Sequence, residues 1–368
     1  MGGSGNSIQR WRLTDGQEVG KQREPGMLVV AISVSRDQKW VVCGMWSGAS
    51  VWDAELREKL IDVDSTNEVR AVDVSPDSTR FATGTREKEA SVWSISSGKR
   101  LVGPLKHDGQ VTGVRFSPSG EHFATACYHD GSVRIFESHT GNEVINIKTI
   151  TSSPGPNTPL VWSNNSQQIL AASSGSTIKS FDVSTGSQLA ESQILDDGEG
   201  NVNVKSIALA TNGSFIATYS GRTIFFLDAS TLTRIGAIIN DSGDMTSISL
   251  SPDSKYIATG QYGKISVHDI GHILLDPLQV STCRFIMSAR QMCPILSPVL
   301  THLLRHLLTS NDNRTSPAVK TNPTVKTSPA AKRAIVTSSK YPFVLFAVKP
   351  SSHNRIGRRA VEYSRSRV

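Results

Sequence analysis

The chain has 368 residues, 29 glycines, an aromatic content of 6% and a formal net charge of +7 at pH 7. This length is sufficient to bury a large core. The sequence shows no secretory signal and no apolar stretch long enough to cross a membrane, and its four cysteines lack the spacing of metal ligands. We therefore expect an intracellular protein, cytoplasmic or nuclear, without membrane association, in which Cys43 and Cys127 are reduced and buried.

The charge is distributed unevenly along the chain. Residues 271–368 carry 15 Lys and Arg against 3 Asp and Glu, which leaves 24 against 29 for residues 1–270. All six tryptophans lie in the acidic part. The chain therefore divides near residue 270 into two parts of different composition.

An eleven-residue phrase recurs through the acidic part. Its clearest copies are VSPDSTRFATG, FSPSGEHFATA and LSPDSKYIATG, and the weaker ones are VSRDQKWVVCG, WSNNSQQILAA and LATNGSFIATY. The six copies begin at residues 34, 74, 116, 162, 209 and 250. Intervals of 40 to 47 residues fit either a four-stranded propeller blade or a long helical repeat.

The pattern inside each repeat is that of β-strands. Short runs of alternating apolar and β-branched residues are separated by Ser-Pro-Asp or Asn-Gly turns, and no apolar stripe follows helical spacing. In the second repeat we predict strands at 69–74, 80–83, 90–93 and 99–102. The repeats are therefore expected to form an all-β protein.

The third predicted strand of each repeat resembles that of the WD-repeat family, which usually ends on Trp-Asp. The first full repeat carries this pair as Trp52 and Asp53. The second repeat has Trp93 followed by a serine, and the third has Phe136 where the tryptophan is expected. The resemblance covers about residues 5–270. It implies a WD-repeat-like β-propeller.

The first residues of the chain match the later half of a repeat. Residues 8–11 align with the third strand, and Trp11 stands where Trp52 stands in the next repeat. We therefore predict six full blades plus an N-terminal half-blade, about seven blades in all. This ring is incomplete unless the C-terminal side returns two inner strands. The best substitute there is CRFIMSARQMCPIL, so we expect the half-blade to be left open or patched by residues 283–296.

The family resemblance also implies a buried tetrad of His, Ser or Thr, Asp and Trp within a blade. The third repeat offers His107, Thr125 and Asp130, with Phe136 in place of the tryptophan. A hydrolase triad uses similar residue types. We favour the structural interpretation, in which a satisfied polar network makes one blade rigid.

Beyond residue 270 the repeats stop. We assign 271–310 to a linker with a short amphipathic helix, because five leucines at 300, 303, 304, 307 and 308 follow helical spacing. His302 and His306 lack a third ligand, so we predict no metal site there.

Residues 311–368 are rich in Ser, Thr, Pro and Lys and contain three tandem hexapeptides that begin at Thr315. We predict a largely disordered basic tail whose removal leaves the melting temperature unchanged. A shifted reading frame is an alternative origin of this tail. The run YPFVLFAVKP within it is either a strand or merely an aggregation-prone apolar stretch.

The functional prediction rests mainly on the resemblance, because the sequence contains no phosphate loop, catalytic carboxylate pair or Cys/His cluster. We predict no enzyme activity, no cofactor and no metal. In this family one propeller face, formed by the loops between fourth and first strands and between second and third strands, commonly takes peptides or protein surfaces. Here that face would carry Arg70, Arg86, Lys88, His107, Tyr128 and His129.

We therefore expect a scaffold or adaptor for protein or peptide partners. Two alternatives remain open. One is a propeller enzyme with a site in the central channel, and the other is binding of nucleic acid or an acidic partner through the basic tail.

Overall fold

The computed structural model describes the repeat-bearing part of the chain and two short segments beyond it. The described residues are 7–12, 17–19, 26–55, 58–63, 67–128, 131–148, 159–173, 177–194, 204, 206–239, 245–261, 264–270, 284–288 and 344–349. Contacts divide the chain into one unit of residues 1–289 with 343–368 and another of residues 290–342. All described residues belong to the first unit.

In the described residues, six antiparallel sheets have four strands each, hydrogen-bonded in chain order. The first three sheets contain β2 (Val29–Val34), β3 (Trp40–Met45), β4 (Gly48–Asp53) and β5 (Lys59–Val63); β6 (Val69–Val74), β7 (Arg80–Thr85), β8 (Glu89–Ser94) and β9 (Arg100–Lys106); and β10 (Gln110–Phe116), β11 (His122–Tyr128), β12 (Ser132–Glu137) and β13 (Glu143–Lys148). The other three contain β14 (Leu160–Trp162), β15 (Gln168–Ser173), β16 (Thr177–Asp182) and β17 (Gln188–Gln193); β18 (Ile207–Leu209), β19 (Phe215–Ser220), β20 (Thr223–Asp228) and β21 (Arg234–Ile239); and β22 (Met245–Leu250), β23 (Tyr256–Gln261), β24 (Lys264–Asp269) and β25 (Arg284–Ser288).

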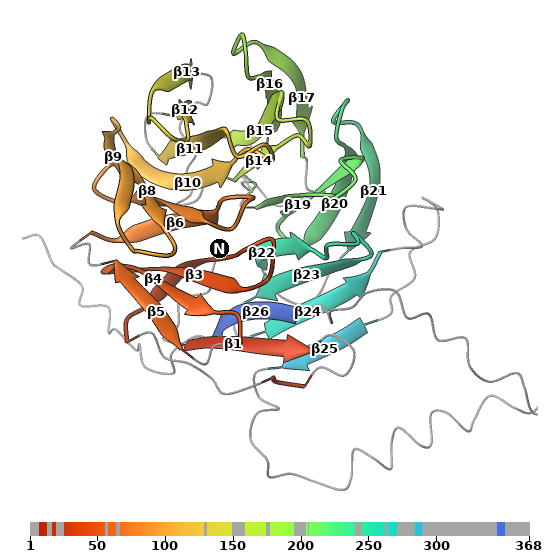
Figure 1. The fold of residues 1–368 in the computed structure, drawn as a ribbon. Helices are drawn as coiled ribbons and strands as arrows, with labels where there is room; N and C mark the ends of the chain where they lie inside the picture. Colours follow the sequence, from red (N-terminus) through yellow and green to blue (C-terminus); the bar gives the residue numbers. More distant parts are fainter. Residues whose placement is uncertain are drawn as a thin grey trace, which may run out of the picture. The chain divides into compact units, whose positions relative to one another are not determined.

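The sheets are the blades of a β-propeller (Figure 1). The first strand of each blade contacts the first strand of the next, in the order β2, β6, β10, β14, β18, β22. Second and third strands such as β7 and β8 are almost fully buried, because neighbouring blades cover both of their faces, whereas fourth strands such as β5 and β17 are largely exposed. The predicted all-β propeller with six full blades is confirmed.

The turn between the first and second strands has the same form in every blade. Five residues separate the two strands in all six blades. The fourth of these residues has a positive φ, between 55° and 77°, at Gln38, Ser78, Gly120, Ser166, Gly213 and Ser254. In the second blade the side-chain oxygen of Ser75 accepts the N–H of Arg80 at 2.9 Å, which fixes the start of the second strand. This turn lies within the eleven-residue phrase that recurs in the sequence, which also includes the end of the first strand and the start of the second.

A further sheet pairs the two ends of the described chain. In it β1 (Ser7–Arg12) pairs antiparallel with β26 (Val344–Lys349). Residues 17–19 continue on the other edge of β1, where the N–H of Val19 donates to the carbonyl of Arg10 at 2.7 Å. We call these segments the seventh sheet.

The seventh sheet corrects the prediction that the half-blade is left open or patched by residues 283–296. Residues 284–288 of that segment form β25, the fourth strand of the sixth blade. The strand that pairs with β1 is instead β26, which lies in the apolar run of the predicted disordered tail. It forms six consecutive residue pairs with β1. The predicted helix at 300–308, the two nearby histidines and the tandem hexapeptides lie outside the described residues.

Candidate functional site

The polar pair predicted in the third blade is present and buried. One ring nitrogen of His107, Nε2, lies 2.9 Å from Oγ1 of Thr125, and Nδ1 lies 2.9 Å from the carbonyl oxygen of Leu105. Because a carbonyl only accepts, Nδ1 carries the proton of the bond to Leu105. The Thr125 hydroxyl also donates to the carbonyl oxygen of Arg134 at 3.4 Å. Asp130, the predicted third member, lies outside the described residues.

An aromatic group occupies the fourth position of this network. The ring of Phe136 meets the His107 ring edge-on at 5.7 Å and stacks on Phe123 at 5.4 Å. His107 is 7% exposed and Thr125 is 0% exposed. The burial of both partners supports a structural role, since a hydrolytic serine or threonine must be reached by its substrate.

In the first two blades a tryptophan occupies the same position of the third strand, but its indole N–H donates to a different hydrogen-bond acceptor in each. In the second blade the indole N–H of Trp93 donates to Oγ1 of Thr83 at 2.9 Å. In the first blade Cys43 stands opposite Ser50, and the indole of Trp52 donates to that serine at 2.9 Å. Two of the three tryptophans predicted to be structural, Trp52 and Trp93, therefore keep a buried hydrogen-bond partner. Burial also raises the pKa of the Cys43 thiol, so this cysteine stays protonated as a small apolar residue, as predicted.

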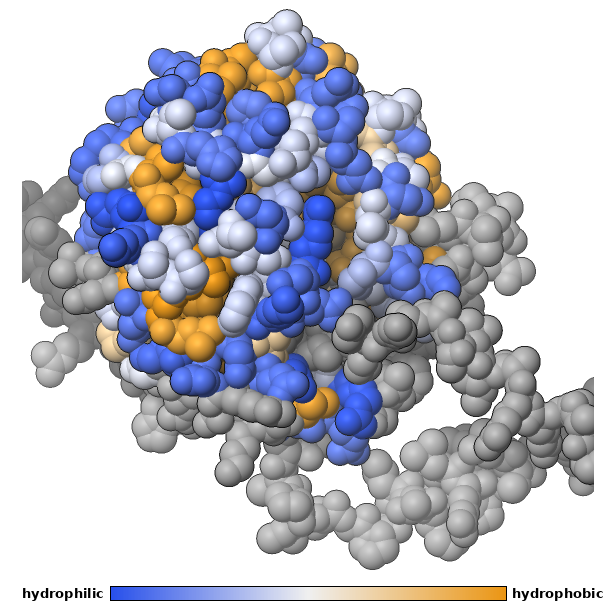
Figure 2. Space-filling view, in the orientation of Figure 1, coloured by the Kyte–Doolittle hydropathy of each residue, from blue (hydrophilic) through white to orange (hydrophobic). Residues whose placement is uncertain are grey.

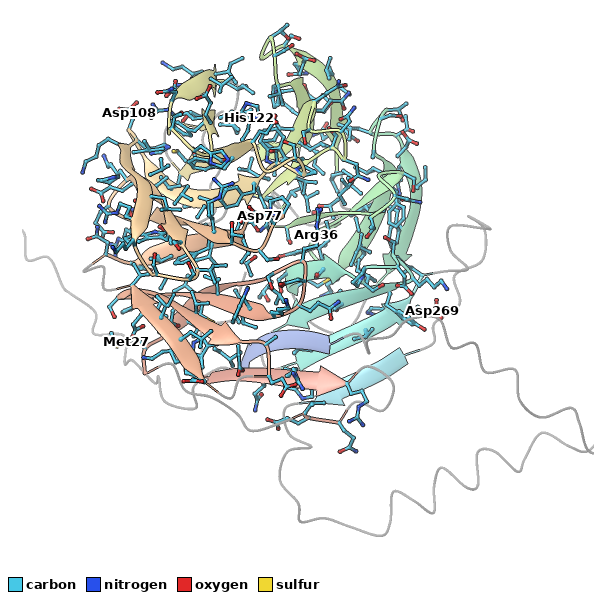
Figure 3. All side chains as sticks on the ribbon, in the orientation of Figure 1. Met27, Arg36, Asp77, Asp108, His122 and Asp269 are labelled. Carbon is cyan, nitrogen blue, oxygen red and sulfur yellow. The ribbon has the colours of Figure 1, made fainter. Side chains whose placement is uncertain are left out.

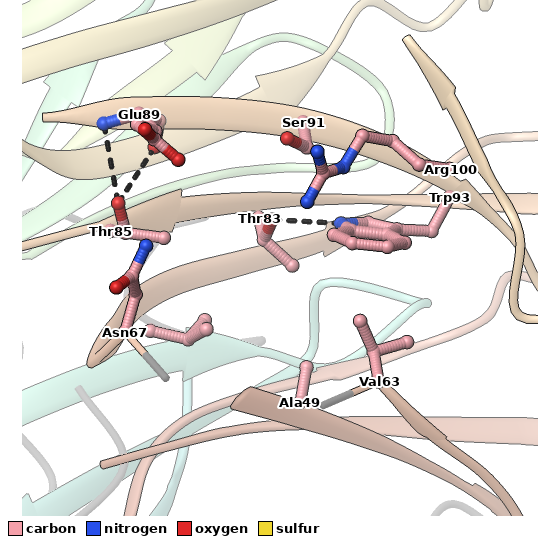
Figure 4. A pocket seen from close by; sticks show the side chains of 10 residues that line it. Ala49, Val63, Asn67, Thr83, Thr85, Glu89, Ser91, Trp93 and Arg100 are labelled. Carbon is pink, nitrogen blue, oxygen red and sulfur yellow. Dashed lines mark hydrogen bonds between the residues drawn. The ribbon is translucent and has the colours of Figure 1, made fainter. Parts of the chain in front are cut away.

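A narrow pocket lies between the first two blades. Thr83, Glu89, Ser91, Trp93 and Arg100 line it from the second blade (Figure 4). Its volume of about 20 Å³ holds roughly one water molecule. Arg100 stacks on the Trp93 ring at 4.6 Å and covers the indole. This pocket is therefore too small for a substrate or cofactor.

The loops on one side of the first three blades are joined by backbone hydrogen bonds. Trp46 donates to Leu28, Gly48 to Asn67, Arg86 to Glu68, and His107 to Lys88, at 2.9 to 3.2 Å. Each bond connects a turn between second and third strands with a segment that leads into a first strand. We call this surface, residues 27–28, 46–48, 67–68, 86–88 and 107, the loop face.

Two exposed apolar side chains lie at one end of the loop face. Trp46 is 57% exposed and Met27 is 44% exposed. Met27 lies at the margin of the first blade (Figure 3). Sequence reasoning missed both residues, although a tryptophan in the short turn between β3 and β4 was a usable signal. In Figure 2 hydrophobic residues of this view form separate patches among hydrophilic ones.

A charged cluster lies in the second-blade part of the loop face. The carboxylate of Glu68, only 10% exposed, is 2.8 Å from Nε of Arg70 and 3.3 Å from Nη1 of Arg86. The Arg86 side chain is 57% exposed, so part of its guanidinium faces solvent. Glu68 thus holds two cationic side chains in place at the second blade.

The structure brings together only some of the residues predicted to bind a partner. Arg86 and Lys88 are exposed in one turn, and Arg70 adjoins them through Glu68. His107 is buried beneath this turn, and Tyr128 ends β11 in the third blade with intermediate burial. His129 lies outside the described residues. Among the residues that the structure describes, no three His, Cys, Asp or Glu side chains are grouped so as to hold a metal ion.

The described part of the chain holds no helix with the length and hydropathy that a membrane span requires.

Comparison with known proteins relates the chain to WD-repeat proteins. The family described as "WD domain, G-beta repeat" matches residues 59–94 and 99–137. WD repeat-containing protein 1 of Gallus gallus is 29% identical over 176 residues, covering 46% of this chain and 28% of that protein. Small ribosomal subunit protein RACK1 of Caenorhabditis elegans is 26% identical over 158 residues, covering 41% of this chain and 48% of that protein. The Serine-threonine kinase receptor-associated protein of Dictyostelium discoideum is 26% identical over 130 residues, covering 35% and 43%. The matched region spans less than half the length of each relative.

Two solved structures share the fold. Hydrazine Synthase of Kuenenia stuttgartiensis superposes with a TM-score of 0.59 at 15% identity, covering 73% of this chain and 83% of that chain. The β-propeller domain of Cps50 (Swd1) from Myceliophteria thermophila gives a TM-score of 0.56 at 14% identity, covering 66% and 84%. At these identities the likeness concerns the fold alone.

The two matched segments each run from the fourth strand of one blade to the third strand of the next, β5 to β8 and β9 to β12. This is the sequence period of the blades. The repeats, their relatives and the six four-stranded blades agree: the chain contains WD repeats at residues 59–94 and 99–137 and folds as a β-propeller similar to those of WD-repeat proteins.

Proposed function

We propose that the protein is a protein-interaction scaffold that binds a peptide or protein surface through its loop face. The observation that carries this proposal is that the loop face exposes both Trp46 and Arg86, the latter paired with the Glu68 carboxylate. Tryptophan and arginine are the residue types most enriched at the energetic centres of protein interfaces.

The mechanism of binding is direct burial of preformed groups. The backbone hydrogen bonds that join the loops hold Trp46 and Arg86 in place before a partner arrives, which reduces the entropy lost on binding. Trp46 and Met27 supply apolar surface, and the solvent-facing part of the Arg86 guanidinium supplies donors for a carbonyl or carboxylate of the partner.

The names of the relatives support this class of function. They include a kinase receptor-associated protein and a small ribosomal subunit protein. Such names describe proteins that act in assemblies with other proteins. The partner of the present chain is not specified by them.

The proposal is tested by affinity capture with the wild type and three variants of the full chain. Trp46→Ala and Arg86→Glu alter the loop face, and Leu101→Ala alters an exposed residue of the outer strand β9. We expect the loop-face variants to lose captured proteins that the wild type and the Leu101→Ala control retain. Capture of the same proteins by all versions contradicts the proposal.

A further inference from the structure

The turn between β7 and β8 contains an exposed lysine in a strained backbone conformation. Lys88 has a φ of 66°, a left-handed conformation that residues other than glycine adopt only at a cost in free energy. In the third blade the residue that directly precedes the third strand is Gly131, with a φ of 62°. Glycine therefore suits this place in the turn, and the second blade carries a lysine there instead.

The other non-glycine residues with a positive φ, among those that the structure describes, have structural explanations. Leu232 is 1% exposed and packs in the core. Four residues occupy the fourth position of the turn that recurs between first and second strands: Gln38, Ser78, Ser166 and Ser254. Lys88 lies outside that recurring turn and exposes its side chain. Backbone strain of this kind is concentrated at functional sites, so the lysine side chain itself is the group to explain.

Hydrogen bonds on both sides hold the turn in this conformation. Oγ1 of Thr85 accepts the N–H of Glu89 and donates to the carbonyl oxygen of the same residue, each at 3.2 Å (Figure 4). The backbone of Arg86 and of Lys88 also bonds to the loops that precede β6 and β10, at 2.9 Å in both cases. The turn therefore presents its side chains from a fixed backbone.

The cationic groups of this turn are available to a partner. The neighbouring carboxylate of Glu89 is already paired with Lys106. Within the described part of the chain the Lys88 side chain has no ion pair or hydrogen bond. Arg86 contacts Glu68 through one guanidinium nitrogen, and its side chain is 57% exposed. Two cationic side chains two residues apart thus face solvent on the loop face.

We propose that the loop face binds an acidic segment of its partner, whose carboxylates pair with Lys88 and Arg86. This inference rests on the proposed function and adds the charge of the partner. One exposed ion pair contributes little affinity, but charges held in place select among partners and speed association. A glycine at position 88 would relax the turn and lose the charge, which explains why a lysine stands there.

Glu87 lies between the two cations in the sequence and makes the charges of the turn alternate. Its side chain is exposed, and it forms no ion pair within the part of the chain that the structure describes. A carboxylate at this position repels an incoming carboxylate and limits the affinity for acidic partners. Glu87→Gln should therefore bind an acidic peptide more tightly than the wild type. Weaker binding by Glu87→Gln would contradict the proposal.

The experiment selects binders for the full chain from a displayed library of random peptides. We expect the peptides that the wild type selects to contain more Asp and Glu than the unselected library. Lys88→Gly should lose this enrichment. Lys255→Ala, which removes an exposed lysine from the turn between β22 and β23, should keep it. Equal enrichment by Lys88→Gly and the wild type overturns the proposal.

Two measurements on purified variants separate binding from folding. A fluorescently labelled copy of one selected acidic peptide should bind Lys88→Gly about threefold more weakly than the wild type, as expected for the loss of one exposed ion pair. Lys88→Gly should melt at no lower temperature than the wild type, because glycine adopts this φ without strain. A lower melting temperature would show that the lysine is needed for stability and would overturn the proposal.

The same selection distinguishes this proposal from that of the loop face. Peptides that bind the wild type but not Trp46→Ala, and that carry no excess of acidic residues, support the loop face and overturn the acidic partner. A wild type that selects no peptide overturns both. Labelled oligothymidine is the competing probe, and its binding, if weakened in Lys88→Gly, would assign the cations to a nucleic acid and overturn the proposal.

Discussion

Single residues decide how each blade satisfies its buried polar groups. The tryptophan of the third strand donates to Thr83 in the second blade and to Ser50 in the first. In the third blade Phe136 replaces the tryptophan, and Thr125 is bound by His107 instead. In these three blades the buried hydroxyl therefore keeps a hydrogen-bond partner, whether or not the tryptophan is present.

Replacing Thr83 by valine tests this account. The substitution leaves the buried indole N–H of Trp93 without its acceptor, so we expect the free energy of unfolding to fall by about 1 to 3 kcal/mol. Thr83→Ser, which keeps the hydroxyl, should recover most of the loss. Chemical denaturation measures both variants, and equal stability of Thr83→Val and wild type contradicts the account.

The carboxylate of Asp228 is held in its charged form by local hydrogen bonds. Bonds from the Ser230 hydroxyl and the Thr231 N–H lower its pKa to about 2. A carboxyl with a depressed pKa in the folded state contributes stability above its unfolded pKa of about 4, and this contribution is lost as the pH falls toward 2. In Asp228→Asn we expect the unfolding free energy to depend less steeply on pH between 4 and 2. An unchanged slope rules out this contribution.

At the scale of elements, the turn between first and second strands explains why the blades were predictable from sequence. The five-residue length of this turn and its first serine recur often enough to reveal the repeat length of the blades. The predicted strands of the second repeat coincide with β6 to β9 within a few residues at each end. The structural residues Trp52 and Trp93 were found because they end a recurring strand.

Of the two strands of the seventh sheet, only β1 could be predicted from the sequence. Trp11 identified β1 as a third strand, but its partner β26 lies more than 300 residues away and lacks the recurring turn. Pairing across such a separation depends on the folded propeller rather than on local pattern. The exposed apolar part of the loop face was missed for a related reason. Trp46 belongs to this face because its N–H bonds to Leu28 of a separate loop, and the sequence pattern does not reveal that contact.

The leading serine of the turn supplies a matched pair of tests at this scale. Ser75 accepts the Arg80 N–H and donates to Asp77, whereas the fifth blade has Ala210 at the same position. We expect Ser75→Ala to lower the unfolding free energy by about 1 kcal/mol and Ala210→Ser to raise it by a smaller amount. Thermal denaturation of the two variants measures this, and changes of the opposite sign would show that the serine does not stabilise the turn.

For the whole molecule, the pairing of β1 with β26 changes what is expected of the C-terminal region. The sequence predicted that loss of residues 311–368 leaves the melting temperature unchanged, but β26 lies within this region. We now expect a chain that ends at residue 343 to melt at a lower temperature and to lose hydrogen-exchange protection at β1. A chain that ends at residue 349 retains β26 and serves as the control. Equal protection of β1 in both would mean that β26 contributes nothing to its stability.

The loop face gives the whole molecule its proposed function, and site-specific photo-cross-linking tests that function most directly. A photoreactive phenylalanine analogue is placed at Trp46 in one version of the full chain and at Leu101, on the outer strand β9, in another. The account expects position 46 to form covalent adducts with a small set of partner proteins and position 101 to form none of them. Identical adducts from both positions, or adducts from position 101 alone, would contradict binding at the loop face.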